Sequence, residues 1–132
     1  MKGLDTNVLL RYLLQDDRAQ AAAVNRLVER LAGPAGPGFI SLPTILEIAW
    51  VLRSRYRMSP IEVAAALDQL LATEALLIQN ERELFAAVSA LREGLGSFED
   101  ALIGALGQWA GCDSTLTFDR KASRLPGFEL IA

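Results

Sequence analysis

Apolar positions along the chain alternate between short runs and longer stretches with helical spacing. The short runs predict strands around Leu4 and at 39–41, 76–78, 115–118 and 129–131. Helical spacing predicts helices over 8–14, 18–31, 44–55, 60–71, 81–93 and 98–110. Short strands that alternate with helices predict an α/β domain with a mostly parallel sheet. In such sheets ligands bind beyond the carboxyl ends of the strands, which is where candidate chemistry is sought.

Local signals mark several helix boundaries. Glu62 follows Ser59 by three residues, the spacing of a capping box at the start of a helix. Gly104 and Gly107 lie four and seven residues after Asp100, on the same helical face. Glycine inside a helix costs about 1 kcal/mol against alanine. We therefore expect another part of the backbone to approach this face closely.

The composition of the chain excludes several kinds of chemistry. A chain of 132 residues fits one domain over 1–132, and its net charge of −3 does not by itself attract nucleic acid. There is no histidine and only one cysteine, Cys112, which excludes a Ser-His-Asp or Cys-His mechanism and an internal disulfide. No leader-like or membrane-spanning run is present, so we expect a cytoplasmic protein without a membrane partner.

Four carboxylates occupy strand ends or early helical turns. Asp5 follows the first predicted strand, and Asp119 follows the strand at 115–118. Glu47 is the only charge between Phe39 and Leu52, on a helix whose other residues are mostly apolar, and Asp100 begins a helix. A carboxylate on a largely covered helix needs a partner or a metal. These positions predict a shared acidic site.

Each acid also has a structural interpretation that the sequence leaves open. Asp5 and Asp119 are good helix N-caps, and Ser97 with Asp100 matches a capping box. Converging carboxylates repel each other unless a cation is present. Oxygen ligands without histidine or cysteine favour Mg²⁺ or Mn²⁺ over zinc. An ion of this kind polarises a phosphoryl oxygen and activates water.

Four blocks of sequence resemble, in order, the PIN-domain toxins of VapBC-type (type II) toxin–antitoxin pairs. The blocks are residues 4–12, 43–47, 100–103 and 117–122, and the resemblance covers the whole chain. It implies a three-layer α/β/α sandwich with a mostly parallel central sheet. It also implies an Mg²⁺- or Mn²⁺-dependent ribonuclease. The catalytic and metal-binding residues would be Asp5, Glu47, Asp100 and Asp119.

The resemblance carries further expectations about supporting residues and partners. Thr6, Asn7, Ser97 and Thr117 would orient the acids, although many relatives have an acid where this chain has Ser97. Such toxins bind an RNA substrate, form homodimers and are inhibited by a cognate antitoxin protein. The RNA sequence cleaved is not predicted. Candidate phosphate contacts are Arg11, Arg120 and Lys121, together with Arg53, Arg55 and Arg57.

Two other functions compete with this one. Phosphoryl transfer through an aspartyl phosphate also places an aspartate after the first strand, but its hydrolase form expects a second aspartate at the position of Asn7. Neither this hydrolase form nor a receiver-type domain accounts for Glu47. A non-catalytic PIN-like domain that only binds RNA or a partner would not need all four acids.

Overall fold

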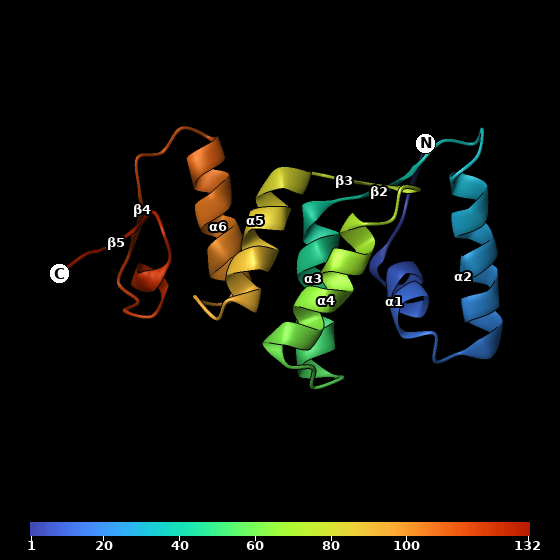
Figure 1. The fold of residues 1–132 in the computed structure, drawn as a ribbon, viewed down its shortest axis with the longest axis horizontal. Coiled ribbons are helices and arrows are strands. Elements are labelled where there is room, and N and C mark those ends of the chain that lie inside the picture. The colour runs from blue at the N-terminus through green and yellow to red at the C-terminus, as the bar shows by residue number, and fades with distance from the viewer.

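The elements form in the predicted order and close to the predicted positions (Figure 1). The computed structural model describes residues 1–132. The strands are β1 (Lys2–Gly3), β2 (Gly38–Ile40), β3 (Leu76–Ile78), β4 (Thr115–Thr117) and β5 (Phe128–Leu130). The helices are α1 (Thr6–Leu14), α2 (Arg18–Leu31), α3 (Leu42–Ser54), α4 (Pro60–Leu71), α5 (Glu81–Arg92) and α6 (Phe98–Trp109), with a short 3-10 helix η1 (Ala122–Arg124).

The predicted capping box at the start of α4 is confirmed. The Ser59 hydroxyl accepts the Glu62 N–H at 3.2 Å, and Glu62 Oε1 accepts the Ser59 N–H at 3.0 Å. The hydrogen bond from the Ser59 backbone, followed by that from its hydroxyl, lowers the pKa of Glu62. The capping box therefore stabilises the fold at neutral pH, and this stabilisation is lost when the pH falls through the folded-state pKa of Glu62.

The parallel α/β character of the fold is confirmed, but the strands divide between two sheets. β1, β2 and β3 pair in that order and in parallel, with Gly3 opposite Phe39 and Phe39 opposite Leu77. β4 and β5 form a separate parallel pair. Figure 1 shows this pair at the opposite end of the molecule from β1 and β2. The carboxyl ends of β1 and β4 therefore do not lie at one sheet edge.

One cluster of 26 buried residues forms the core. Its largest fully buried side chains come from five of the helices and from β2, and include Leu9, Ile48, Leu67, Leu84 and Phe98. The neighbouring helix pairs α3–α4, α4–α5 and α5–α6 pack against each other. None of the helices combines the length and the apolar character that a membrane crossing requires.

Another segment does approach the two α6 glycines closely, but it does so with side chains and not with the backbone that the sequence led us to expect. A Cβ atom at Gly104 would lie 2.4 Å from the Phe128 ring, and one at Gly107 would lie 3.1 Å from the Thr115 hydroxyl. Both neighbours belong to the segment that forms β4 and β5. Because glycine has no side chain, α6 can pack closely against the β4–β5 pair.

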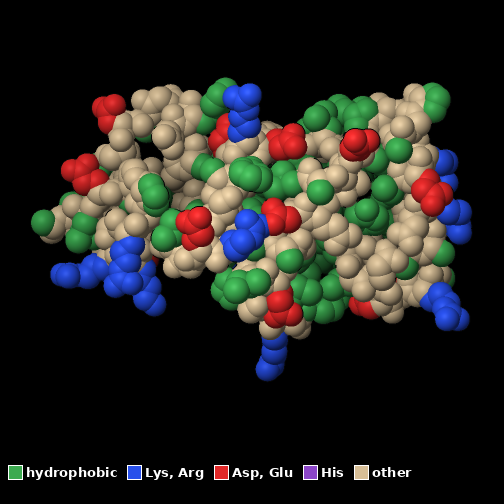
Figure 2. Space-filling model, viewed as in Figure 1, with side chains coloured by type: hydrophobic (Ala, Val, Ile, Leu, Met, Phe, Trp, Pro, Cys, Tyr) green, Lys and Arg blue, Asp and Glu red, His purple; other side chains and the backbone are tan.

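The surface carries mixed charge with local groupings. Figure 2 shows basic side chains gathered at the end of the molecule that holds β4, β5 and η1, where the sequence contributes Arg120, Lys121 and Arg124. One acid, Glu83 of α5, is buried. Glu83 is 8% exposed and accepts a hydrogen bond from the Asn80 amide at 3.4 Å. Glu83 is buried because this face of α5 packs inward, together with Leu84 and Val88.

Candidate active site

Asp5 lies between the end of β1 and the start of α1 and caps the helix. Its backbone is extended, and Oδ1 accepts the Val8 N–H at 3.2 Å. The side chain is exposed, and Oδ2 has no protein donor. The capping and the functional interpretations of Asp5 are therefore compatible, because one oxygen fixes the carboxylate while the other faces outward.

Glu47 lies on the exposed face of α3. Ile45, Ile48 and Leu52 are fully buried on the opposite face, while Glu47 and Trp50 are exposed. The helix is largely covered, as its apolar sequence predicts, but Glu47 itself lies on the face that is open to solvent. The expected polar partner is nevertheless present, because the buried Thr6 hydroxyl donates to Glu47 Oε1. This contact ties α1 to α3 and leaves Oε2 without a protein donor.

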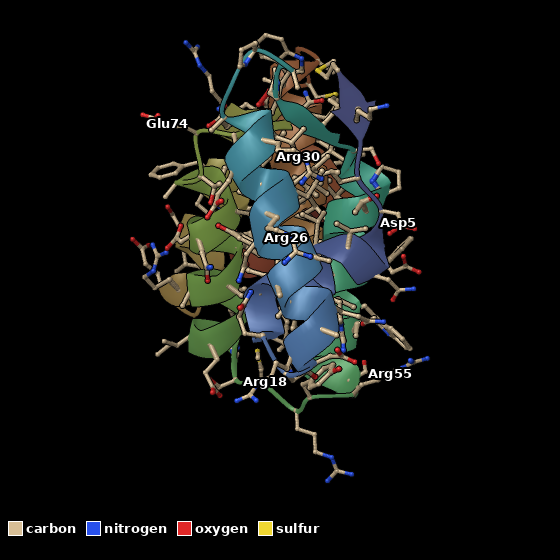
Figure 3. The ribbon with its side chains drawn as sticks, turned by 90° about the vertical axis from the view of Figure 1, so that its right-hand side faces the viewer. Asp5, Arg18, Arg26, Arg30, Arg55 and Glu74 are labelled. Carbon is tan, nitrogen blue, oxygen red and sulfur yellow. The ribbon has the colours of Figure 1, made fainter.

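Asp5 and Glu47 line one pocket of about 330 Å³. They reach it from segments that are far apart in sequence and are joined through Thr6. The remaining lining residues are Thr6, Asn7, Leu10, Trp50, Val51 and Arg55. Arg55 forms no ion pair or hydrogen bond with another side chain and lies on the same side of the molecule as Asp5 (Figure 3). The pocket thus offers two carboxylates, one free guanidinium and an exposed aromatic ring.

A larger hollow of about 620 Å³ lies beside α4 and α5, but its chemistry is less specific. It is lined by Asp68, Leu71, Ala72, Glu81, Arg82 and Phe85. Of its two acids, only Glu81, the first residue of α5, comes shortly after a strand, β3, and Asp68 is already paired with Arg92. The pocket at Asp5 and Glu47 is the better candidate for catalysis, because two conformationally fixed acids meet there.

Asp100 lies in the first turn of α6, outside this pocket. Ser97 caps the helix by accepting the Asp100 N–H at 3.1 Å, as the sequence predicted. The preceding residue, Glu99, pairs with Arg53 of α3 at 2.9 Å. Arg53 is six residues beyond Glu47, about 9 Å along the helix axis. The start of α6 is therefore anchored near the carboxyl-terminal end of α3 rather than beside Glu47.

Asp119 also lies outside the pocket, in the turn between β4 and η1. Its Oδ1 accepts the Lys121 N–H at 2.8 Å and the Ala122 N–H at 3.4 Å. Thr117, predicted to orient the acid, accepts the backbone N–H of Asp119 at 3.0 Å and does not contact its carboxylate. The contacts of Asp119 are those of a local cap.

The structure thus brings together two of the four predicted acids. No group of three or more Asp, Glu, Cys or His side chains is close enough to hold a metal ion. For Asp119 the physical reason is the division of the strands, since β4 pairs with β5 and not with β1. For Asp100 it is the anchoring of α6 to Arg53 through Glu99. The roles of Asp100 and Asp119 as metal ligands stay predictions from the resemblance.

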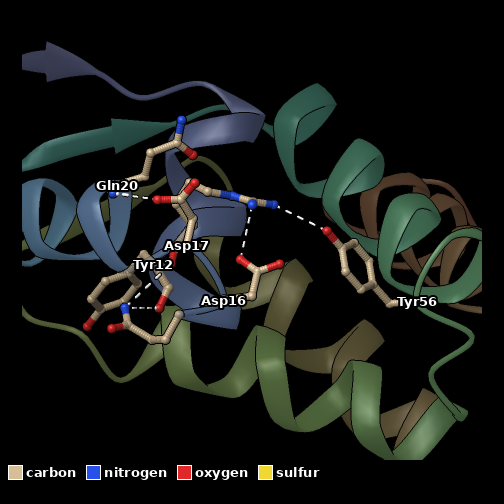
Figure 4. A network of polar contacts seen from close by, with 7 residues as sticks. Tyr12, Asp16, Asp17, Gln20 and Tyr56 are labelled. Carbon is tan, nitrogen blue, oxygen red and sulfur yellow. Dashed lines mark hydrogen bonds and ion pairs between the residues drawn. The ribbon is translucent and has the colours of Figure 1, made fainter.

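The predicted basic residues are also placed individually. Arg11 pairs with Asp16 at 3.0 Å and donates to the Tyr56 hydroxyl at 3.2 Å (Figure 4). The hydrogen bond to Tyr56 and the charge of Asp16 raise the pKa of Arg11. Arg120 and Lys121 are exposed beside Asp119, at the far end from the pocket. Arg55 is therefore the only basic residue lining the candidate site, a selection that sequence spacing alone did not make.

Comparison with known families agrees with the fold and the order of the blocks. The family model described as PIN domain matches residues 3–127. The chain belongs to the PIN domain family. PIN domains are generally metal-dependent nucleases, although some are non-catalytic. No curated protein matches this PIN domain. The family match does not favour the aspartyl-phosphate alternatives.

Proposed function

We propose that this PIN domain is an Mg²⁺- or Mn²⁺-dependent ribonuclease that hydrolyses RNA phosphodiester bonds at the pocket between α1 and α3. The observation that carries the proposal is the meeting of Asp5 and Glu47 in one solvent-open pocket with Arg55. The pairing of acids with a free arginine suits a phosphate substrate that binds together with a cation. Family membership supports nuclease chemistry, and the RNA substrate is our inference.

The residues of the pocket fit a hard divalent cation. Asp5 Oδ2 and Glu47 Oε2 accept no hydrogen bond from the protein, so each acid has one oxygen available. Mg²⁺ is commonly held by one or two carboxylates, with waters and substrate phosphate completing its shell. Asp5 and Glu47 are therefore the residues that would hold the ion. When bound, the ion would supply charge neutralisation at the phosphate and activation of water.

The other pocket residues hold and orient the reacting groups. The Val8 N–H fixes the Asp5 carboxylate, and the Thr6 hydroxyl fixes that of Glu47. The first-turn amides of α1 point toward the helix N-terminus and stabilise negative charge placed there. Arg55 carries a planar guanidinium suited to contact two phosphate oxygens at once. The chain's own groups thus position a phosphodiester against two carboxylates.

We expect cleavage of RNA to require Mg²⁺ or Mn²⁺ and to stop in excess chelator. Added Ca²⁺ should not restore activity, because a larger ion with variable coordination positions the attacking water poorly. The measurement is loss of a fluorescently labelled single-stranded RNA in each metal condition. Cleavage that persists in excess chelator, after contaminating nuclease has been excluded with a Glu47→Gln preparation, would overturn the mechanism.

A second candidate function is binding of RNA or a partner without catalysis. The observation that favours it is the position of Asp100 and Asp119 outside the pocket, which leaves two acids where the resemblance implies four. Both functions expect the pocket to bind RNA, but only one expects turnover. Metal binding measured by calorimetry, without any RNA cleavage over a range of substrates, would favour the non-catalytic function.

The contacts of Asp119 give a separate prediction about its role. If Asp119 is a local cap, Asp119→Ala should lower the free energy of unfolding by roughly 1 kcal/mol, equally with and without Mg²⁺. Urea unfolding of parent and variant, with chelator and with saturating Mg²⁺, measures this. A variant that is as stable as the parent without metal but gains less from Mg²⁺ would instead make Asp119 a ligand, because stabilisation by a bound ion follows its affinity for the folded state.

We further propose that this ribonuclease acts in the cytoplasm as the toxin of a toxin–antitoxin pair, as a homodimer inhibited by a cognate antitoxin. The ordered sequence blocks from Asp5 to Lys121 support this proposal, because they resemble those toxins over the whole chain. Exposed apolar side chains beside the acids, Leu46 and Trp50, offer contact area for an inhibitor. The identity of the target RNA is a separate question that requires sequencing of cleavage products.

A further inference from the structure

Trp50 is the one aromatic side chain among the residues that line the pocket of Asp5 and Glu47. It lies three residues after Glu47 on α3, so the two side chains are neighbours on one helical face. Trp50 is 50% exposed, although the helix buries six other residues in the core. Burial of aromatic surface is strongly favourable, so an exposed ring beside the acids is available to a ligand.

The rest of the pocket indicates what kind of ligand the ring meets. Leu10 and Val51 also line the pocket, but both are buried, so Trp50 is its one exposed apolar side chain. Arg55 adds an unpaired guanidinium, while Asp5 and Glu47 supply the acids. The Trp50 ring suits the base of a nucleotide. The Arg55 guanidinium, together with a metal ion held by Asp5 and Glu47, suits its phosphate. The pocket volume of about 330 Å³ is at the small end for ligand pockets and suits a ligand of the size of one nucleotide.

We propose that Trp50 is a stacking platform for an unpaired base next to the scissile phosphate, and therefore a substrate-positioning residue of this pocket. The inference rests on the proposed ribonuclease function and names a residue that binds its substrate. A base can stack on an aromatic ring only when its face is free, and in a duplex both faces are covered by neighbouring bases. Stacking of a base on an aromatic side chain typically contributes about 10- to 100-fold in affinity and tolerates any base.

The fluorescence of Trp50 provides a direct test of binding. The chain has two tryptophans, and Trp109 is exposed and does not line the pocket, so Trp109→Phe leaves Trp50 as the only reporter. With Ca²⁺ in place of Mg²⁺, so that a cation is present but cleavage is not supported, a single-stranded RNA oligonucleotide should quench the emission of this variant in a saturable way. The same RNA annealed into a duplex, and an oligonucleotide with abasic sites, should quench it little. Equal quenching by duplex and single strand, or no quenching by either, would overturn the inference.

Kinetics then separate stacking from a general effect on the fold. Trp50→Ala should raise KM for single-stranded RNA about 10- to 100-fold while kcat changes little, and Trp50→Phe should restore most of the loss. Trp109→Ala, the matched control at an exposed tryptophan outside the pocket, should leave KM unchanged. An unchanged KM in Trp50→Ala would overturn the stacking role without affecting the ribonuclease proposal. Saturable quenching without any metal-dependent cleavage would instead reject the ribonuclease and retain single-strand binding.

Discussion

Asp5→Asn and Glu47→Gln are each expected to lower kcat/KM for RNA cleavage by more than about 100-fold, because even groups that only support metal ligands typically contribute about 10- to 100-fold. Both substitutions preserve shape and remove one negative charge. Asparagine is as good an N-cap as aspartate, so the Val8 contact and the start of α1 are retained. Glutamine keeps an oxygen that accepts from the Thr6 hydroxyl. The loss should therefore appear in activity and not in stability.

The matched control is Glu74→Gln, which removes the same charge at an exposed position. Figure 3 shows Glu74 on the opposite side of the molecule from Asp5. This control should keep full activity. In cells, the Asp5→Asn protein should be tolerated far better than the parent at equal expression level. Near-parental kcat/KM in either acid variant would reject the pocket as the catalytic site, and equal growth inhibition by the two proteins would reject the toxin proposal.

Phe98→Ala is expected to lower the free energy of unfolding by about 3–5 kcal/mol, the usual range for a phenylalanine removed from a core. Phe98 is 1% exposed and belongs to the core cluster, at the first position of α6. It also borders a pocket of about 230 Å³ lined by Ala49, Val63 and Leu91 from three other helices. The substitution therefore enlarges existing empty space and loosens α6 from α3, α4 and α5.

Urea unfolding measures this difference, provided that the dependence of stability on denaturant is the same in the two proteins. Phe85→Ala is the matched control, because Phe85 is also helical but 60% exposed. Its substitution should change stability by no more than about 0.5 kcal/mol, as is usual for surface positions. A loss of less than about 1 kcal/mol for Phe98→Ala would show that α6 is not anchored in the core as the structure describes.

Helix and strand positions followed from the sequence because local physics specifies them. The predicted ranges for α2, α4 and β3 coincide with the observed ones, and the other predicted elements differ by only a few residues at their ends. Capping by Ser59 and Ser97 was predictable because a hydroxyl and the amide three residues later meet wherever a helix begins. The crowded face of α6 was predictable because glycine is otherwise unfavourable inside a helix.

The sequence specifies where each candidate acid lies along the chain, but it does not specify which of these acids share a pocket. Asp5 and Glu47 were selected from their positions after a strand and within an apolar helix, and the structure places both in one pocket. A site that also includes Asp100 and Asp119 was expected from a single sheet that contains all of the strands. Three-residue strands carry few ladder hydrogen bonds and little side-chain pattern, so nothing local specifies which strand lies beside which.

By itself the sequence determined the element order, the helix caps, the exclusion of Ser-His-Asp and Cys-His mechanisms, and the family through its ordered blocks. The tertiary structure alone decided which acids meet, which face of α3 opens to solvent and which arginine reaches the pocket. Caps and periodicity depend on residues a few positions apart, whose geometry the backbone dictates. The site depends on contacts between distant segments, such as that of Thr6 with Glu47, and these follow from how whole helices and sheets pack.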